Sequence, residues 1–259
     1  MHASSALICR VFYFALVLIS FLTIPQTATA TINYADFSNN PNSVTFVGDG
    51  SFQGGSARLI DGLFGGGRAA MWSNTEQPVR NGFVCMFSFR ISDPQVYSEL
   101  PPEIPRQGGA DGFAFVIHTW GTGAIGNGGG QIGYATDLDG DPLGIPYSLA
   151  IEFDTYKNDQ LNDPDGNHIS VHNAGQYYNS ADENDGSSLA RINSSSLGIN
   201  LKDGNIHNVR IEYDGAVMKI FVDDFVTPKL NFSVDLNAIL WEGSQNATVG
   251  FTAGAAAES

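Results

Sequence analysis

The segment from Gly82 to Ile91 places an apolar side chain at every second position. These side chains are Phe83, Cys85, Phe87, Phe89 and Ile91. Successive side chains of a strand point to opposite faces, so a period of two indicates a strand with one buried face. We interpret the alternation as core rather than as a ligand-binding stripe. Further short runs of this kind follow, separated by Gly, Asn and Asp turns, and no sustained helical period interrupts them. The pattern predicts an all-β sandwich.

The N-terminus has the pattern of a secretory leader. Arg10 precedes an apolar run from Val11 to Ile24, and Ala28-Thr29-Ala30 forms a small-residue cleavage site. A membrane anchor is the alternative, but the run is shorter than the ~20 apolar residues of a full span. We therefore expect a signal peptide over residues 1–30, cleavage after Ala30, secretion, and one domain over residues 31–259. No later segment is apolar enough for membrane insertion.

The charge of the chain narrows the choice of partners. There are 12 Lys and Arg residues against 27 Asp and Glu residues, a formal net charge of −15. Such a chain is repelled by nucleic acid and by anionic membranes, so neither is an expected partner. Cys9 lies in the expected leader, which leaves Cys85 without an intramolecular disulfide partner. A secreted domain of this kind depends on its core, to which bound metal would add stability.

The segment from Leu149 to His172 combines two expected strands with a group of polar side chains that can bind metal ions. Two carboxylates share one face of the first strand, and they repel each other unless a cation lies between them. The candidate ligands are Glu152, Asp154, Asn158, Asp163 and His168. Oxygen ligands suit Ca²⁺, and an imidazole with carboxylates suits a borderline transition ion such as Mn²⁺. The alternative is an acidic hairpin loop with solvated carboxylates, which the strand on each side and the terminal histidine argue against.

The same residues resemble the metal-binding stretch of the legume-type (L-type) lectins. The matching sequence is Glu152-Phe-Asp154-Thr-Tyr156-Lys-Asn158, then Asp163-Pro164 and His168, all with the family's spacing. The resemblance covers nearly all of residues 31–259. It implies a concanavalin A-like jelly-roll β-sandwich with a flat back sheet and a curved front sheet. It also implies a transition ion held by Glu152, Asp154, Asp163 and His168, and calcium held by Asp154, Asn158, Asp163 and the carbonyl of Tyr156.

The resemblance further implies a sugar site. Asp111 begins the sequence Asp-Gly-Phe that matches the family's sugar-binding aspartate, whereas a lone carboxylate at this place would usually be a turn residue. The Gly-rich run from Gly126 to Gly133 lacks the Lys-Ser/Thr pair of a phosphate loop and resembles the loop that donates a backbone N–H to the sugar. The peptide between Ala110 and Asp111 is expected to be cis. The implied carbohydrate-binding residues are Asp111, Gly129, Gly130, Tyr156, Asn158, Ala257 and Glu258, of which the last two would occupy a specificity loop.

Two parts of the sequence depart from the family pattern. His172-Asn173 stands where the family has an Asp, and we interpret His172 as a surface residue and Asn173–Ser188 as a polar loop without evident chemistry. Val249–Ala253 matches the family's V-G-F-[ST]-A motif, but the strand that follows it in the family has no match before Ser259. We therefore expect a missing C-terminal strand and an unpaired edge in the back sheet. Any homo-oligomer is expected to form through that sheet.

These observations favour a lectin that binds neutral sugars of glycans or glycoproteins and is not an enzyme. A glycoside hydrolase on the same sandwich is the first alternative, and it needs two carboxylates around the glycosidic bond. Glu152-Phe-Asp154 resembles the E-x-D-x-x-E strand of one such family, but Lys157 occupies the place of its second Glu. An adhesion or interaction module without sugar binding is the second alternative. Sequons at Asn193, Asn231 and Asn246 predict a glycoprotein if the source is eukaryotic.

Overall fold

The computed structural model describes residue 34 and residues 36–39, 41–60, 66–91, 110–136 and 143–256. Most of these residues belong to short strands. The strands are β1 (Val44–Gly48), β2 (Ser51–Gln53), β3 (Ser56–Arg58), β4 (Gly66–Ser73), β5 (Phe83–Phe89), β6 (Gly112–His118), β7 (Ser148–Asp154), β8 (His168–Asn173), β9 (Ser188–Ile192), β10 (His207–Tyr213), β11 (Val217–Val222), β12 (Leu230–Ser233) and β13 (Thr248–Ala256). Single turns of helix connect some of them: η1 (Gly129–Gln131), η2 (Asp159–Leu161), α1 (Ser194–Leu197) and α2 (Leu236–Ile239).

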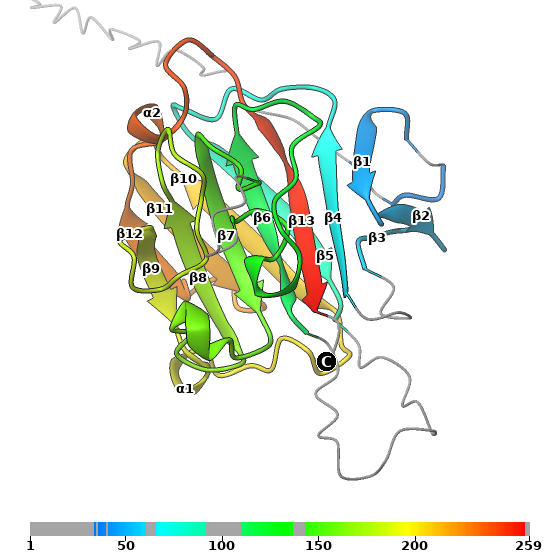
Figure 1. Cartoon of the computed structure of the whole chain (residues 1–259), viewed down its shortest axis with the longest axis vertical. Helices are drawn as coiled ribbons and strands as arrows, with labels where there is room; N and C mark the ends of the chain where they lie inside the picture. The colour runs from blue at the N-terminus through cyan, green and yellow to red at the C-terminus, as the bar shows by residue number, and fades with distance from the viewer. Residues whose placement is uncertain are drawn as a thin grey trace, which may run out of the picture.

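The strands form two layers (Figure 1). A seven-stranded sheet has the order β1-β4-β13-β6-β7-β8-β9, and a four-stranded sheet has the order β12-β11-β10-β5. A separate hairpin joins β2 to β3. All described pairings are antiparallel, and distant parts of the chain meet in them, as where β13 lies between β4 and β6. The expected jelly-roll sandwich is therefore confirmed.

Aromatic side chains fill the space between the two sheets. Phe87, from the alternating segment in β5, has its ring 4.8 Å from that of Phe251 and 6.0 Å from that of Phe153. The stacked rings of Phe113 and Phe153 are 4.7 Å apart. The whole apolar face of β5 and the face of β6 that carries Phe113, Phe115 and Ile117 belong to this core. The period of two thus correctly predicted which side chains face the core.

A second apolar cluster covers the outer face of the seven-stranded sheet. Small side chains such as Ala114 and Ala150 alternate with the core residues along β6 and β7, and loop residues lie over them. Trp72 and Tyr134 are fully buried in this cluster, where the Trp72 indole N–H donates to the carbonyl of Ala124 at 2.8 Å. The outer face of the central strands of this sheet is therefore also buried, which determines the environment of the polar side chains on it.

Turns and caps lie at the ends of several strands. The Asp214-Gly215 turn joins β10 to β11, and the Asp214 carboxylate accepts from the N–H of Ala216 at 3.0 Å. Strand β12 ends at Ser233, and Asp235 then caps α2 by accepting from the N–H of Asn237. Strand β4 begins at Gly66, within the Gly65–Gly67 run.

The four-stranded sheet has an open edge within the described residues. There β5 pairs only with β10, and its outward side chains Val84 and Met86 are each 61% exposed. The expected leader over residues 1–30, residues 92–109 and residues 257–259 lie outside the described residues. Among the residues that are described, no helix has the length and apolar character needed to cross a membrane. The asparagines of the three sequons are all exposed.

Candidate metal centre

The register of β7 and β8 places the polar side chains of both strands on the outer face of the seven-stranded sheet. Asp154 pairs with His168, Glu152 with Ser170, and Ala150 with His172. The intervening residues, such as Ile151 and Ile169, point into the core between the sheets. Because both strands alternate in phase, the carboxylates of one strand face the imidazoles of the other. The polar residues that share this face are almost fully buried: Glu152, Asp154, His168, Ser170 and His172.

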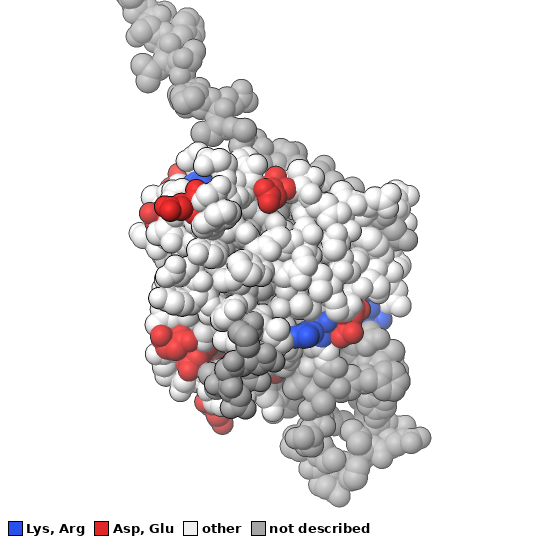
Figure 2. Space-filling view, turned by 45° about the horizontal axis from the view of Figure 1, so that its top comes forward, with Lys and Arg blue, Asp and Glu red and all other residues white. Residues whose placement is uncertain are grey.

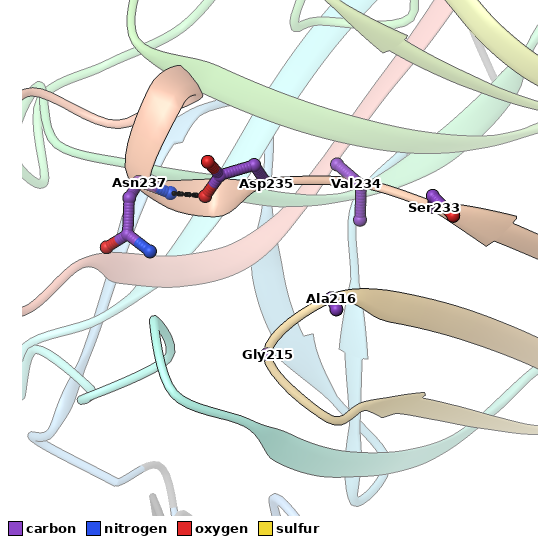
Figure 3. A pocket seen from close by; sticks show the side chains of 6 residues that line it. All are labelled: Gly215, Ala216, Ser233, Val234, Asp235 and Asn237. Atoms are coloured by element: carbon purple, nitrogen blue, oxygen red, sulfur yellow. Dashed lines mark hydrogen bonds between the residues drawn. The ribbon is translucent and has the colours of Figure 1, made fainter.

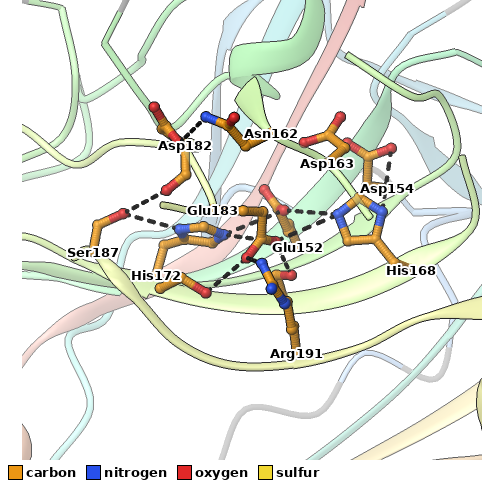
Figure 4. A network of polar contacts seen from close by, with 12 residues as sticks. Glu152, Asp154, Asn162, Asp163, His168, His172, Asp182, Glu183, Ser187 and Arg191 are labelled. Atoms are coloured by element: carbon orange, nitrogen blue, oxygen red, sulfur yellow. Dashed lines mark hydrogen bonds and ion pairs between the residues drawn. The ribbon is translucent and has the colours of Figure 1, made fainter. Parts of the chain in front are cut away.

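Four of the expected ligands of the transition ion come together here (Figure 4). Ligand atoms of Asp154, Asp163 and His168 lie within 4.8 Å of one another, and His168 Nε2 lies 3.5 Å from Glu152 Oε1. Asp163 reaches the strands because the turn of η2 folds the 155–167 loop back over them, with Leu161 buried in the second apolar cluster. The donor set of three carboxylates and an imidazole fits a borderline divalent cation.

The calcium ligands implied by the resemblance also lie together. The Asn158 N–H donates to Asp163 Oδ2 at 2.6 Å, and the Tyr156 N–H donates to Asp154 Oδ1 at 2.8 Å. Asn158 is 7% exposed, and its Oδ1 has no hydrogen-bond partner among the described residues. A buried amide oxygen without a partner is costly. An oxygen-binding cation beside two carboxylates would satisfy it, so these residues fit Ca²⁺.

The charges of the group depend strongly on one another. Burial disfavours the imidazolium of His168, yet contact with the carboxylates of Glu152 and Glu183 outweighs it and raises the pKa of His168 to about 11. Burial raises the pKa of Asp163 to about 7 and raises that of Asp154 as well, although the Asn158 and Tyr156 N–H groups and His168 act in the opposite direction. The protein alone thus neutralises some of these groups with protons, a role that bound cations would take over.

The expected sugar residues lie beside the calcium ligands. Asp111 directly precedes β6, the peptide between Ala110 and Asp111 is cis as expected, and the Asp111 carbonyl accepts from the Thr155 N–H at 2.8 Å. The Asn158 amide donates to Asp111 Oδ1 at a long 3.5 Å. These bonds attach the start of β6 to the loop that carries Asn158. The side chain of Asp111 has no exposed surface.

The Gly-rich loop comes close to the same point. A Cβ atom at Gly130 would lie 2.7 Å from the Asn158 amide carbon, and one at Gly254 would lie 2.5 Å from the carbonyl oxygen of Gly129. Gly129 itself has a φ of 58°, in the left-handed region that glycine adopts easily. The loop therefore packs its backbone directly against both Asn158 and β13. Tyr156 is half-buried, and Ala257 and Glu258 lie outside the described residues.

Two residues of the group were missed at the level of sequence. His172 is fully buried, with Nε2 3.4 Å from Glu152 Oε1, so its interpretation as a surface residue is wrong. Glu183 comes from the 173–188 loop that was expected to have no chemistry, and its Oε1 lies 3.5 Å from the Nε2 atoms of both His168 and His172. Side chains alternate between the two faces along β8, so His172 lies on the same face as His168. Nothing local indicated that the loop would cover that face and carry Glu183 into it.

The other described surface features carry fewer acids and histidines than this group. A pocket of about 490 Å³ opens between the β10–β11 turn and the segment from Ser233 to Asn237 (Figure 3). Its one carboxylate, Asp235, already caps α2, and none of the metal-ligand or sugar residues lines it. The face shown in Figure 2 is mostly uncharged, with acidic side chains in small separate groups. The densest described group of acids and histidines is therefore buried, on the outer face of the seven-stranded sheet.

Comparison with known proteins gives a family match across the chain. The legume lectin domain model matches residues 29–259. A galactose-binding lectin from Arachis hypogaea is 27% identical over 175 residues, which cover 61% of this chain and 56% of that protein. The chain thus aligns with little more than half the length of this curated relative.

Solved structures show the same fold. Peanut lectin with a nine-residue peptide matches with a TM-score of 0.61 and 24% identity, over 86% of this chain and 88% of that one. A Bauhinia forficata lectin in complex with GalNAc matches with a TM-score of 0.60 and 21% identity, over 87% of this chain and 91% of that one. At these identities the structures show the sandwich fold alone.

Proposed function

The chain belongs to the legume lectin domain family, and we propose that it is a carbohydrate-binding protein whose binding of neutral glycans depends on calcium and a transition ion. The observation that carries the proposal is the meeting of Asp111, Asn158 and Gly130 directly beside the calcium ligands. A carboxylate that accepts from sugar hydroxyls, an amide and a backbone N–H together suit a polyhydroxylated ligand without charge. Net acidity of the chain disfavours polyanionic glycans.

Two sets of residues, which share Asp154 and Asp163, would hold the two metals. Asp154, Asn158, Asp163 and the Tyr156 carbonyl would hold calcium, and Glu152, Asp154, Asp163 and His168 would hold the transition ion. Bound calcium supplies positive charge that fixes the side chain of Asn158 and the loop around Tyr156. The Asn158 side chain would then keep one orientation relative to Asp111 and Gly130.

A hydrolase has less support than a lectin. The Lys157 side chain is half exposed and pairs with Asp159 at 2.6 Å, so no carboxylate stands in the place of the second catalytic acid. Glu152 is buried, and its Oε2 accepts from the Tyr134 hydroxyl at 2.6 Å. A buried carboxylate that faces two imidazoles is poorly placed to attack a glycosidic bond.

A glycan array with the intact chain tests the proposal. We expect binding to neutral glycans when Ca²⁺ and a transition ion are present, and loss of that binding with chelator. Asp111→Asn should abolish binding while calcium uptake persists, because Asp111 lies outside the calcium set. Full binding by chelated protein, or by Asp111→Asn, would contradict the proposed site. An array without any glycan signal from the metal-loaded chain would favour an interaction module that does not bind sugar.

We also propose that the protein is secreted after removal of residues 1–30. The apolar run after Arg10 and the Ala-Thr-Ala site support this reading. Sequencing the N-terminus of the protein expressed with its own leader should give Thr31 first. Retention of Met1 in the mature protein would contradict it.

A further inference from the structure

The 198–206 segment, between α1 and β10, brings a lysine against the loop that follows β7. Lys202 Nζ donates to the carbonyl of Thr155 at 2.6 Å, although the two residues are 47 positions apart in the chain. Thr155 has no exposed surface, and Lys202 is half-buried. The contact therefore joins a segment that carries none of the expected site residues to the stretch between Asp154 and Tyr156.

Thr155 in turn holds the backbone of Asp111. Its N–H donates to the Asp111 carbonyl at 2.8 Å, and its hydroxyl donates to the same oxygen at 2.9 Å. Both residues are without exposed surface, so a shift that broke these bonds would leave buried polar groups unpaired. The position of Asp111 thus depends on where Thr155 lies.

The peptide unit that joins Thr155 to Tyr156 is fixed at both of its polar ends. Its carbonyl accepts from Lys202, and its N–H donates to Asp154 Oδ1 at 2.8 Å. A peptide unit is planar, so a rotation that moves the carbonyl also moves the N–H and the backbone of Thr155. The bond from the ammonium is charge-assisted and about twice as strong as a bond between neutral groups. Loss of the Lys202 donor would therefore loosen the whole unit.

The backbone that carries Lys202 is itself held in place. Asn167 Oδ1 accepts from the N–H of Leu201 at 2.8 Å, and the Asn167 amide donates to the carbonyl of Ile199 at 2.7 Å. The side chain of Leu201 is fully buried in the core between the sheets. Lys202 thus extends from a backbone that is already ordered, which lowers the entropy cost of its contact with Thr155.

We propose that Lys202 is a positioning residue of the glycan site, which acts through Thr155 to hold Asp111 in place. The proposal rests on the proposed function, because Asp111 is the sugar acceptor in that function. A methionine at this position has a similar length but no donor, whereas an arginine can still donate to the Thr155 carbonyl.

Titration of the intact, metal-loaded chain on an array of neutral glycans tests the proposal. Lys202→Met should weaken glycan binding by about tenfold, and Lys202→Arg should restore most of the lost affinity. Lys229→Met is the matched control, since the half-buried Lys229 makes the same kind of bond, at 2.8 Å to the carbonyl of the buried Leu197. This control should bind glycans as the wild type does.

Hydrogen exchange at the Thr155 amide gives a second readout, which needs no glycan. Because this N–H donates to the Asp111 carbonyl, its exchange should be at least about tenfold faster in Lys202→Met and unchanged in Lys229→Met.

Four results would overturn the role of Lys202. They are wild-type glycan affinity in Lys202→Met, an equal loss of affinity in Lys229→Met, no recovery in Lys202→Arg, and unchanged exchange at Thr155. A wild-type chain that binds no glycan would instead refute the lectin proposal. Faster Thr155 exchange in Lys202→Met alone would then still support the hold of Lys202 on Asp111.

Discussion

A methyl group at Gly130 tests whether the Gly-rich loop holds the amide of Asn158 in place. An added Cβ would lie 2.7 Å from both the Cγ and the Oδ1 of Asn158. This is about 0.8 Å short of the ~3.5 Å at which carbon atoms begin to attract, so the Asn158 side chain has to move. The backbone of Gly130 does not have a positive φ, so alanine introduces steric overlap without backbone strain.

The consequence for calcium follows from the size of that movement. Calcium accepts oxygen ligands between about 2.3 and 2.6 Å, a range narrower than the displacement. We expect Gly130→Ala to weaken calcium binding by at least about tenfold, or about 1.4 kcal/mol, and to weaken glycan binding with it.

Titration calorimetry with Ca²⁺ and a glycan that the array identifies would measure both effects. Gly123→Ala is the matched control, since it lies in the same connection and a Cβ there meets no atom within 4 Å. Wild-type calcium and glycan affinities in Gly130→Ala would refute the argument that this loop positions Asn158.

Three further outcomes follow from the structure. Phe115→Ala should lower the free energy of unfolding by about 3–5 kcal/mol in urea denaturation, because Phe115 is 4% exposed, whereas Val84→Ala, at a position 61% exposed, should stay within about 0.5 kcal/mol. Free Ca²⁺ at 100 times its Kd should stabilise the stripped protein by about 2.7 kcal/mol, and an unchanged melting temperature would contradict folded-state binding. Burial opposes the charge of His207, but Asp223 at 2.8 Å and Asp203 raise its pKa. The stabilisation from this ion pair should be complete below the unfolded pKa of about 6.5 and be lost as pH rises through the folded value. A pKa below 6.5 for His207 by NMR, or the same pH profile in His207→Gln, would contradict this.

The sequence alone determined the strands and one part of the site. Alternation along 82–91 identified a buried face because the side-chain period of a strand is local. Glu152, Asp154, Asn158, Asp163 and His168 were recognised together because they lie within one hairpin, so their spacing already limits how far apart they can be. Asp111 and Gly130 were assigned through resemblance, since the chain places them far from Asn158 and spacing says nothing about their approach.

The tertiary structure determined which polar side chains are buried. The alternation of side chains along β8 places His172 on the same face as His168, but it does not indicate whether that face is exposed to solvent or covered by protein. Loops that pack Tyr134 and Leu161 over the sheet bury it, and the 173–188 loop brings in Glu183. Burial of this face depends on contacts between segments distant in sequence, and no local pattern encodes them. For that reason the sequence did not indicate that His172 and Glu183 lie buried beside Glu152 and His168.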